Sequence, residues 1–272
     1  MAELSDAEEA LVFRQHFDDV RDLVRELHPL AARWSHTLGS EWIFRGHWCS
    51  SWELVPSLYR KDKIDKFLTG MDAWEDVVKL GAEGVQAMET TLLTRVFAEF
   101  DRAGLEIPEV QSVRGLLDDT SYLPDVVVPF VALAQHHGVP TRLLDWTTQG
   151  KVAAYFAAAG VTHGTSFRHD LEVVAININA FAIANLVGKD DVFRVVHAPR
   201  ASNSNLHAQS GVFTVCHGQF PKTPLDKLIL ERLANTQPRP VVQRLTLPQA
   251  LAGALLNNLH AEGVSGSTMF PG

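Results

Sequence analysis

The sequence has only two cysteines, Cys49 and Cys216, among its 272 residues. Two cysteines provide no disulfide framework, so we expect the protein to work in a reducing cytoplasm. The longest apolar runs are too short and too interrupted to span a membrane. The acidic first nine residues lack the pattern of a signal peptide. We therefore expect a cytoplasmic protein that has no membrane partner.

Basic residues are also few: 24 lysines and arginines stand against 32 acidic residues, which gives a net charge of −8. Proteins that coat nucleic acid by bulk electrostatics usually carry a basic stripe, so this balance argues against that class and leaves only a local positive pocket open. No stretch rich in Gly, Ser or Pro divides the chain. We expect an N-terminal helical segment over 1–34 and one principal domain over 35–272.

Several catalytic and metal-binding signatures are missing. The chain has no Gly-rich phosphate loop, no nucleophile elbow and no HExxH motif. His47 and Cys49 lie close in sequence, but no second cluster has the spacing of metal ligands. Adjacent residues such as His136 and His137 diverge on a helix, so they rarely bind one metal ion together. We therefore expect no metal site.

Hydrophobic spacing predicts helices in the first half of the chain and strands mostly in the second. The expected helices cover 5–34, starting at a Ser5–Glu8 capping box, then 72–100 as one helix or two, 126–136, 149–159 and 248–260, with a short helix inside the connection 104–124. The expected strands cover 42–44, 172–179, 192–196, 211–216 and 241–247. This order predicts an α+β fold, with N-terminal helices followed by a mainly antiparallel β core and flanking helices.

Arg45 is the first candidate for chemistry, because the apolar strand 42–44 leads directly to it. A guanidinium group offers a planar fork of donors that suits phosphate or carboxylate. Gly46 would let another backbone or a ligand approach closely. An equally weighted alternative is that Arg45 pairs with a buried carboxylate and only holds loops together.

The segment 133–147 is the second candidate, because it places His136, His137 and Asp145 between apolar residues. One histidine could face a pocket and the other the core, and a structural, hydrogen-bonded role is expected for at least one. The leucines before Asp145 should bury that part of the chain, and a buried carboxylate needs a partner. Arg45 is a natural candidate for this partner, which would make the pair structural.

Two more polar positions adjoin expected element ends. Asp145, Thr147 or Thr148 could cap the helix that starts at 148 or 149 and ends at 159, with the two threonines favoured. The N-terminus of this helix also offers free N–H groups to an anion. Gln209 stands where the strand 211–216 begins, with Gly211 permitting close approach. It could hold an amide or a ribose hydroxyl, or form only a strand-edge hydrogen bond, and neither role is favoured.

Three segments and the tail carry a family resemblance. They are Phe44-Arg45-Gly46 with Trp52, Pro56-Ser57-Leu58 and Arg60; the stretch 135–147, which reads QHHGVPTRLLDWT, with 153–157; the stretch 208–214, which reads AQSGVFT; and Met269-Phe270-Pro271. Together they resemble the FRG domain family, named for its Phe-Arg-Gly signature. The resemblance covers roughly Ser35 to the C-terminus, and 135–147 is its most specific part.

The chain is also more distantly similar to ADP-ribosyltransferases of the Arg–Ser–Glu type. Phe44-Arg45-Gly46 looks like their first, aromatic-Arg-Gly strand, and 144–148 leading to Ala153 and Phe156 looks like their second strand and helix. The resemblance implies an ADP-ribosyltransferase-like fold and an NAD-dependent mono-ADP-ribosyltransferase-like enzyme with a nucleic-acid or protein acceptor. It also suggests a toxin or phage-defence effector. Gln209 stands where the third element of that family would carry a glutamate.

The resemblance also implies roles for individual residues. The catalytic set would be Arg45 on the pyrophosphate or ribose, His136 on ribose hydroxyls or in proton transfer, Asp145 as an orienting or charge-stabilising carboxylate, and Gln209 beside the acceptor. The NAD site would further include Phe44, Gly46, His137, Thr141, Arg142 and Thr147. One alternative is a non-catalytic module that binds or senses a nucleotide or nucleic acid, which accounts better for Gln209. Another is a purely structural polar cluster.

Overall fold

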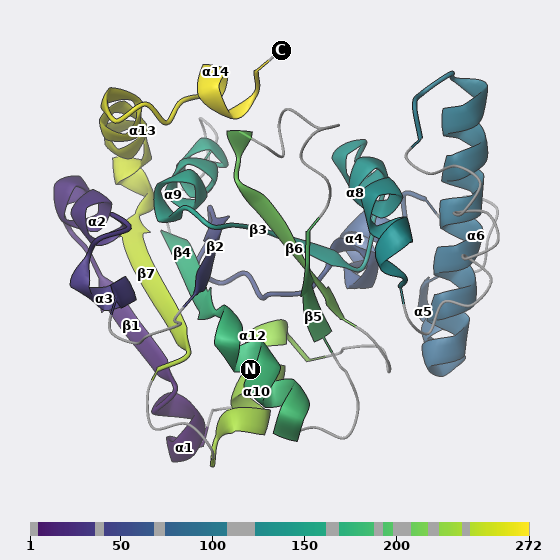
Figure 1. The fold of residues 1–272 in the computed structure, drawn as a ribbon, viewed down its shortest axis with the longest axis horizontal. Helices are drawn as coiled ribbons and strands as arrows, with labels where there is room; N and C mark the ends of the chain where they lie inside the picture. The colour runs from purple at the N-terminus through teal and green to yellow at the C-terminus, as the bar shows by residue number, and fades with distance from the viewer. Residues whose placement is uncertain are drawn as a thin grey trace.

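A computed structural model describes residues 5–35, 41–67, 74–107, 123–161, 169–187, 193–197, 208–216, 223–235 and 240–271. Within these residues the strands form one seven-stranded sheet at the centre of the molecule (Figure 1). The strands are β1 Val12–His16, β2 Trp42–His47, β3 Leu143–Thr147, β4 Asp170–Asn177, β5 Phe193–Val196, β6 Gly211–Cys216 and β7 Val242–Pro248, in the spatial order β1-β7-β4-β2-β3-β6-β5. β1 is parallel to β7, and the other pairings are antiparallel. The predicted α+β class with a mainly antiparallel sheet is confirmed.

The N-terminal segment is not the helix that its hydrophobic spacing predicts over 5–34, with a break or bend at Pro29. It consists of α1 (Asp6–Glu9), strand β1, α2 (Val20–Glu26) and α3 (Ala32–Ser35). Ser5 and Glu8 do form the predicted capping box. The helix prediction is wrong at β1, because this strand takes its backbone partner from β7, near the other end of the chain, which local periodicity cannot reveal. The N-terminal segment thus contributes an edge strand to the common sheet.

The remaining helices follow the sequence pattern in part. They are α4 Lys61–Ile64, α5 Trp74–Lys79, α6 Gly81–Arg102, α8 Val128–His136, α9 Gly150–Ala159, α10 Ile178–Val187, α12 Leu225–Leu233, α13 Ala252–Ala261 and α14 Gly266–Met269, with 3-10 turns at Ser57–Tyr59, Asp125–Val127 and Gln249–Leu251. The predictions for α8 and α9 are confirmed. The helix predicted over 72–100 is the pair α5 and α6, because Gly81 takes a φ of 72° between them.

Other boundaries differ from the prediction. The strand predicted over 172–179 is β4, and it ends at Asn177 because α10 starts at the next residue. The final helix begins as the 3-10 turn Gln249–Leu251 before it continues as α13. α4, α10, α12 and α14 were not predicted, whereas a strand at the position of β3 was expected only from the resemblance of 144–148. The short helix predicted within 104–124 falls mostly on 108–122, which lies outside the described residues.

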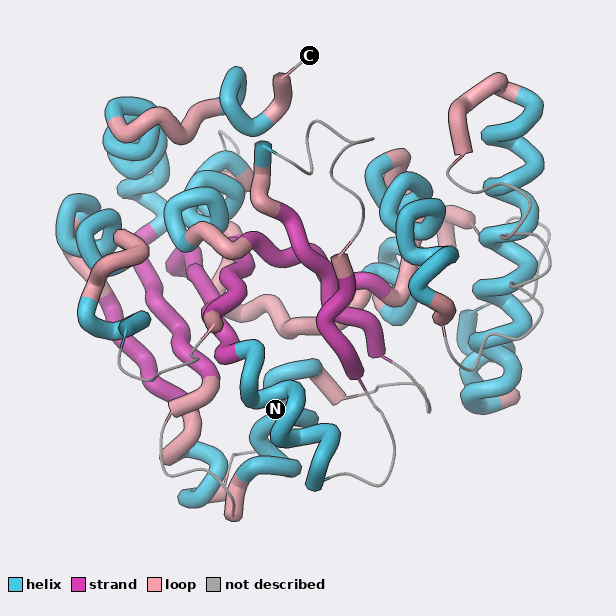
Figure 2. The backbone as a smooth tube through the Cα atoms, viewed as in Figure 1, coloured by secondary structure: helices cyan, strands magenta, loops and turns pink. Residues whose placement is uncertain are grey.

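Helices cover both faces of the sheet (Figure 2). On one face, Phe44 of β2 packs in a core shared with α2, α9 and α13. Successive residues of a strand point to opposite faces, and Ile43 accordingly joins the core formed with α10 and α12. A third core joins the β3, β5 and β6 end of the sheet to α5, α6 and α8. β2 is the middle strand of the sheet. Because alternate residues of a strand share a face, the side chain of Arg45 leaves β2 on the same face as that of Ile43.

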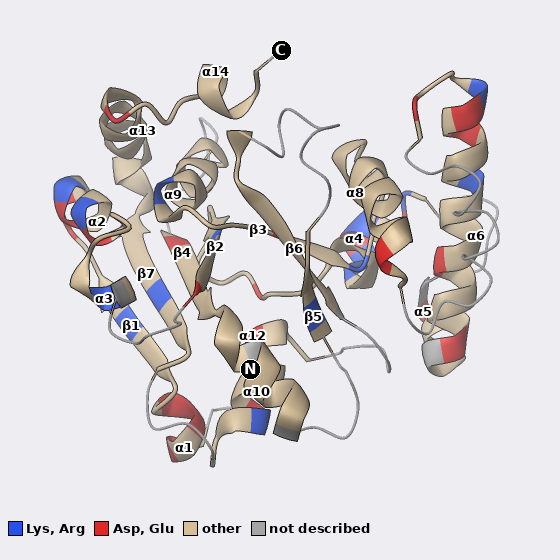
Figure 3. Cartoon of the chain, in the orientation of Figure 1, with Lys and Arg blue, Asp and Glu red and all other residues tan. Residues whose placement is uncertain are grey.

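Charged residues of both signs are interspersed over the helices. In Figure 3, α2 and α6 each carry acidic and basic residues, so neither helix presents a single sign to solvent. Among the described helices, none combines the length and the apolar character needed to cross a membrane.

Candidate functional site

Arg45 links β2 to β3 through its side chain. The two strands pair at Phe44 and Thr147. Beside this pair, Nη1 of Arg45 donates a hydrogen bond of 2.6 Å to the main-chain oxygen of Asp145. The guanidinium group thus bonds to the β3 backbone two residues before the paired Thr147, so it is positioned by the sheet itself.

Arg45 is also held by a second partner and by the Asp145 carboxylate. Its Nε donates to Nε2 of His47 over 3.1 Å, and Oδ2 of Asp145 lies 3.6 Å from Nη1. The Arg45 side chain is 17% exposed and that of Asp145 is 61% exposed, so the expected burial of this carboxylate is wrong. Within the described residues, Nη2 of Arg45 has no hydrogen-bond or ion-pair partner. One amino group of the guanidinium therefore remains for an anion.

Asp145 is held in turn by the segment that precedes β3. The Gln135 side-chain amide donates to Oδ1 of Asp145, and the Thr141 hydroxyl donates to the Gln135 side-chain oxygen. The N–H of Thr141 donates to Oγ of Ser57 over 3.0 Å, and its main-chain oxygen accepts from the N–H of Leu58 over 3.0 Å. The loop after β2 therefore docks on the start of β3, beside Asp145.

Arg60 brings a second guanidinium group to the same place. Burial lowers the pKa of Arg60, and the charge of Arg45 lowers it further, whereas Asp62 and Asp145 act in the opposite direction. Its Nε is buried and has no hydrogen-bond partner in the part of the chain that the structure describes. Two arginines therefore lie close enough to repel each other near the exposed carboxylate of Asp145. Such an arrangement is favourable for binding an anion.

Thr147 and Gln209 connect β3 to the third family segment and to the tail. The Thr147 hydroxyl donates to the main-chain oxygen of Gln209 over 2.7 Å and accepts from the N–H of Gln149 over 3.1 Å. Nε2 of Gln209 donates to the main-chain oxygen of Met269 over 3.1 Å. Gln209 thus fastens the C-terminal tail beside the N-terminus of α9, and its amide is engaged in that contact.

The neighbours of Arg45 in the signature pack into the core. Phe44 is 5% exposed, and its ring lies edge-to-face against Trp34 with 4.9 Å between the ring centroids. A Cβ on Gly46 would overlap the main-chain oxygen of Ala153 and lie 2.7 Å from the nitrogen of Ala157. Gly46 therefore permits the backbone of α9, rather than a ligand, to approach β2 closely. Both positions serve the packing of α9 on the sheet.

Arg142 and the two histidines lie apart from this group. Nε of Arg142 donates to both carboxylate oxygens of Glu89, over 3.0 and 2.8 Å, in a buried ion pair. His136 and His137 are exposed at the end of α8, and the His137 ring packs against Phe100 with 5.1 Å between the ring centroids. No hydrogen bond or ion pair between described residues joins either histidine to Arg45 or Asp145. The structure thus brings together Arg45, Asp145 and Thr141 but not His136, His137 or Arg142.

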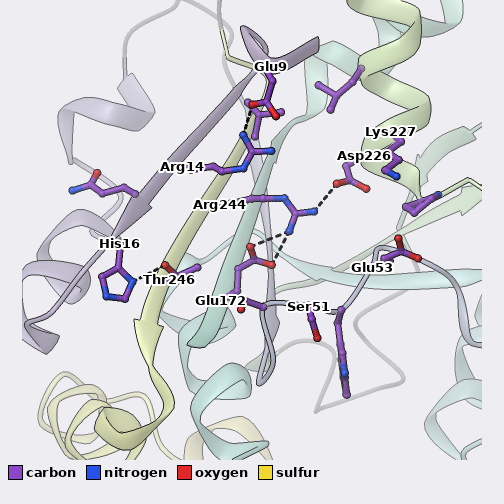
Figure 4. Close-up of a pocket in the computed structure, with 16 residues that line it drawn as sticks. Glu9, Arg14, His16, Ser51, Glu53, Glu172, Asp226, Lys227, Arg244 and Thr246 are labelled. Carbon is purple, nitrogen blue, oxygen red and sulfur yellow. Dashed lines mark hydrogen bonds and ion pairs between the residues drawn. The ribbon is translucent and has the colours of Figure 1, made fainter. Parts of the chain in front are cut away.

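A buried chain of charges that sequence reasoning missed continues from His47 to Glu172, Arg244 and Asp226, and Figure 4 shows the last three of these residues. Nδ1 of His47 lies 3.7 Å from Oε2 of Glu172 in β4. Nη1 of Arg244 in β7 donates to both oxygens of Glu172, over 2.9 and 2.8 Å, and its Nη2 donates to Oδ2 of Asp226 in α12 over 2.5 Å. Although burial opposes it, the carboxylates of Glu172 and Asp226 raise the pKa of Arg244.

The pKa of His47 is lowered from its ordinary value. Burial lowers the pKa of His47, and the charges of Arg45 and Arg244 lower it further, while Glu172 partly offsets them. A neutral imidazole with its proton on Nδ1 leaves Nε2 to accept from Arg45. The signal that could have revealed this chain is a charged residue inside an apolar strand pattern, as at Glu172 and Arg244.

Within the described part of the chain, no three or more His, Cys, Asp and Glu side chains lie together in a way that could hold a metal ion.

Searches of curated proteins and of solved structures found no match. Residues 40–165 match the family described as the FRG domain, a range that contains Arg45, Arg60 and Asp145 and leaves out the third segment and the tail. The resemblance of the chain to the FRG domain family is thereby confirmed over residues 40–165.

Proposed function

We propose that Arg45, Arg60 and Asp145 bind the phosphate groups and adjoining ribose of a nucleotide. The observation that carries this proposal is the partly buried Arg60, whose Nε has no acceptor and which lies in the field of Arg45. Two like charges at close range raise each other's free energy, and a phosphate accepts hydrogen bonds from both guanidinium groups while it cancels the repulsion. Asp145, which is largely exposed, lies beside them to accept from a ribose hydroxyl.

We further propose NAD as the substrate and ADP-ribosyl transfer as the reaction. In this reaction the bond between ribose C1′ and the nicotinamide nitrogen breaks, and nicotinamide leaves with the bonding electrons. A nucleophilic oxygen or nitrogen of a nucleic-acid or protein acceptor bonds to C1′, and its proton passes to a base or to solvent. The carboxylate of Asp145 would stabilise the positive charge that develops on the ribose, an effect on the order of 3 kcal/mol for one well-placed group.

The distant similarity to ADP-ribosyltransferases supports this choice of substrate, together with the neighbouring positions of β2, β3 and α9. In this arrangement Arg45 would hold the pyrophosphate through Nη2, while Nη1 and Nε stay fixed by Asp145 and His47. Gln209 would take no direct part, since its amide is bonded to the main chain of Met269.

The experiment measures nicotinamide release and labelling by tagged NAD, with purified protein and cell extract. We expect Arg45→Lys, Arg60→Gln and Asp145→Asn each to lower the rate by at least about tenfold, since each removes a charge-assisted contact. Arg102→Gln is the matched control, because Arg102 only pairs with Glu99 on the surface of α6. If the wild-type protein neither binds nor consumes NAD in the presence of extract, the transferase proposal is wrong.

A second candidate is a non-catalytic nucleotide- or nucleic-acid-binding module. The engaged amide of Gln209 favours it, because the position where the resemblance expects a catalytic glutamate carries a side chain that secures the tail. Calorimetry with NAD, ADP and short RNA separates the two functions. Saturable binding that depends on Arg60, without release of nicotinamide, would select the module.

A further inference from the structure

A cavity of about 880 Å³ lies beside the buried chain of charges, between strands β1, β7 and β4 and the start of α12 (Figure 4). The loop 50–53 closes one side of it, and Arg45 does not line it. Its size falls within the range of small-molecule sites, roughly 300–1,000 Å³. The cavity is therefore large enough for an organic ligand and is separate from the nucleotide site proposed above.

The inner wall of this cavity carries an uneven set of charges. Glu172 and Asp226 are 3% and 7% exposed, and Arg244 lies between their carboxylates (Figure 4). Two carboxylates share this one guanidinium, so one negative charge remains unbalanced. His47 balances it poorly, because burial lowers the pKa of the imidazole. An unbalanced buried charge is unfavourable, and a bound cation would remove the imbalance.

Asp226 also lacks a hydrogen-bond donor. Its Oδ2 accepts from Arg244, whereas Oδ1 is buried and has no partner among the side chains and main chain that the structure describes. Buried carboxylate oxygens without a donor are rare in proteins. The unpaired oxygen and the unbalanced charge are thus two independent observations, and both point to a ligand that brings a donor and a positive charge.

The rim of the cavity adds no net charge of its own and provides an aromatic surface. Glu9 forms an ion pair of 2.5 Å with Arg14, and the rim further carries one acidic residue, Glu53, and one basic residue, Lys227. Trp52 lines the cavity and is 38% exposed. Aromatic faces attract organic cations. A metal ion is a poorer fit, since no group of three metal-binding side chains occurs in the described ranges.

We propose that this cavity is a ligand site for a small organic cation, a molecule that carries a primary ammonium or a guanidinium group. The cationic group donates to Oδ1 of Asp226 and balances the charge shared by Glu172, Asp226 and Arg244. The rest of the molecule lies along Trp52. This site is independent of the nucleotide function.

Calorimetry with the wild-type protein tests the proposal, with agmatine, putrescine and benzylamine as cationic probes and 1,4-butanediol as the uncharged comparison. We expect saturable binding of at least one cation and none of the diol. Asp226→Asn removes the charge that binds the cation, so it should weaken binding by about tenfold or more, as expected for a hydrogen bond to a charged group. Ser51→Trp should also weaken it, because Ser51 lines the cavity and a larger side chain there leaves less room for a ligand.

If Asp226→Asn does not fold, cation binding by Ser51→Trp is compared with that of the wild type and still tests the proposal. Arg60→Gln is the matched control: it should abolish nucleotide binding and leave cation binding unchanged. The proposal is overturned if none of the three cations binds saturably, or if a cation binds equally well to Ser51→Trp and to every folded Asp226 variant. Neither result would bear on the nucleotide site.

Discussion

The guanidinium of Arg45 is hydrogen bonded to the main chain of Asp145, 100 residues further along the sequence, over 2.6 Å. This contact joins the Phe-Arg-Gly strand to the segment 135–147, and both lie within the residues 40–165 that match the FRG domain. Because the acceptor is a backbone oxygen, the position of Arg45 is fixed whether or not the Asp145 carboxylate is present. The exposed carboxylate therefore remains available for a ligand.

Arg60→Gln distinguishes a binding residue from a structural one. Arg60 is partly buried near a like charge and its Nε lacks an acceptor, so its loss should leave the free energy of unfolding in phosphate-free buffer equal or slightly higher, within about 0.5 kcal/mol. Added ADP should raise the urea midpoint of the wild-type protein and not that of the variant. Arg102→Gln, at an exposed pair on α6, should respond to ADP as the wild type does. A large destabilisation by Arg60→Gln without ADP would assign Arg60 to the fold.

Gly46→Ala should destabilise the protein by about 3 kcal/mol or more, because overpacking of this kind leaves no room for relaxation. The added Cβ would meet the backbone of α9 at Ala153 and Ala157 rather than a flexible side chain. Gly253→Ala is the matched control: Gly253 lies exposed in α13 with nothing within 4 Å of the added atom. That change should stabilise by about 0.5–1 kcal/mol through helix propensity. Equal free energies of unfolding for the two variants would contradict the packing of α9 on β2.

The buried pair of Arg142 and Glu89 should behave as a structural unit. Arg142→Met alone should cost about 3–5 kcal/mol, because it leaves the Glu89 carboxylate buried without its partner. The double variant Arg142→Met with Glu89→Leu should recover much of that loss, since both charges are then gone. Urea denaturation of the two single variants and the double variant measures the coupling. Additive losses in this cycle would show that the two charges do not depend on each other.

The sequence predicts local features well and partnerships poorly. The apolar pattern of α9 and the alternation in β7 follow from neighbouring residues, and both elements were found where they were predicted. β1 was predicted as helix because the apolar residues around it recur near helical spacing. The segment is a strand because Val12–His16 pairs with β7, which local spacing does not show. In the site, Arg45 and Asp145 were expected to be partners and are, yet Asp145 is exposed rather than buried.

The site residues that were not predicted from the sequence were missed for one physical reason. Glu172 lies on β4, Arg244 on β7 and Asp226 on α12. They form a group only because Arg244 forms ion pairs with both carboxylates in the folded protein. No spacing in the sequence announces such a group, because three separate elements bring it together. Arg142 shows the converse error: its place in the most specific family segment suggested NAD binding, whereas its partner Glu89 lies in α6 and is 1% exposed.

His47 should make stability depend on pH. Burial lowers its pKa in the folded protein from the ordinary value of 6.5, and the facing charges are Arg45, Glu172 and Arg244. Below that ordinary value the unfolded chain takes up a proton at His47 that the folded protein refuses. The contribution of neutral His47 to stability is therefore fully present above about pH 6.5 and is lost as the pH falls through the lower, folded-state pKa, by at most about 1.4 kcal/mol per pH unit.

His47→Gln isolates this contribution, because a side-chain amide oxygen can accept the hydrogen bond from Nε of Arg45 and does not titrate. We expect the free energy of unfolding of the variant to fall less steeply than that of the wild type between about pH 6.5 and pH 5, above the range in which most carboxylates titrate. His260→Gln, at an exposed position of α13, should leave the wild-type slope unchanged. Since protonation of His47 in the folded protein would remove the acceptor for Arg45, nucleotide affinity should stay level until the pH falls to the lowered, folded-state pKa of His47, and should decline there in the wild type and not in His47→Gln. Parallel pH profiles for the wild type and His47→Gln would mean that His47 titrates as freely in the folded protein as in the unfolded chain.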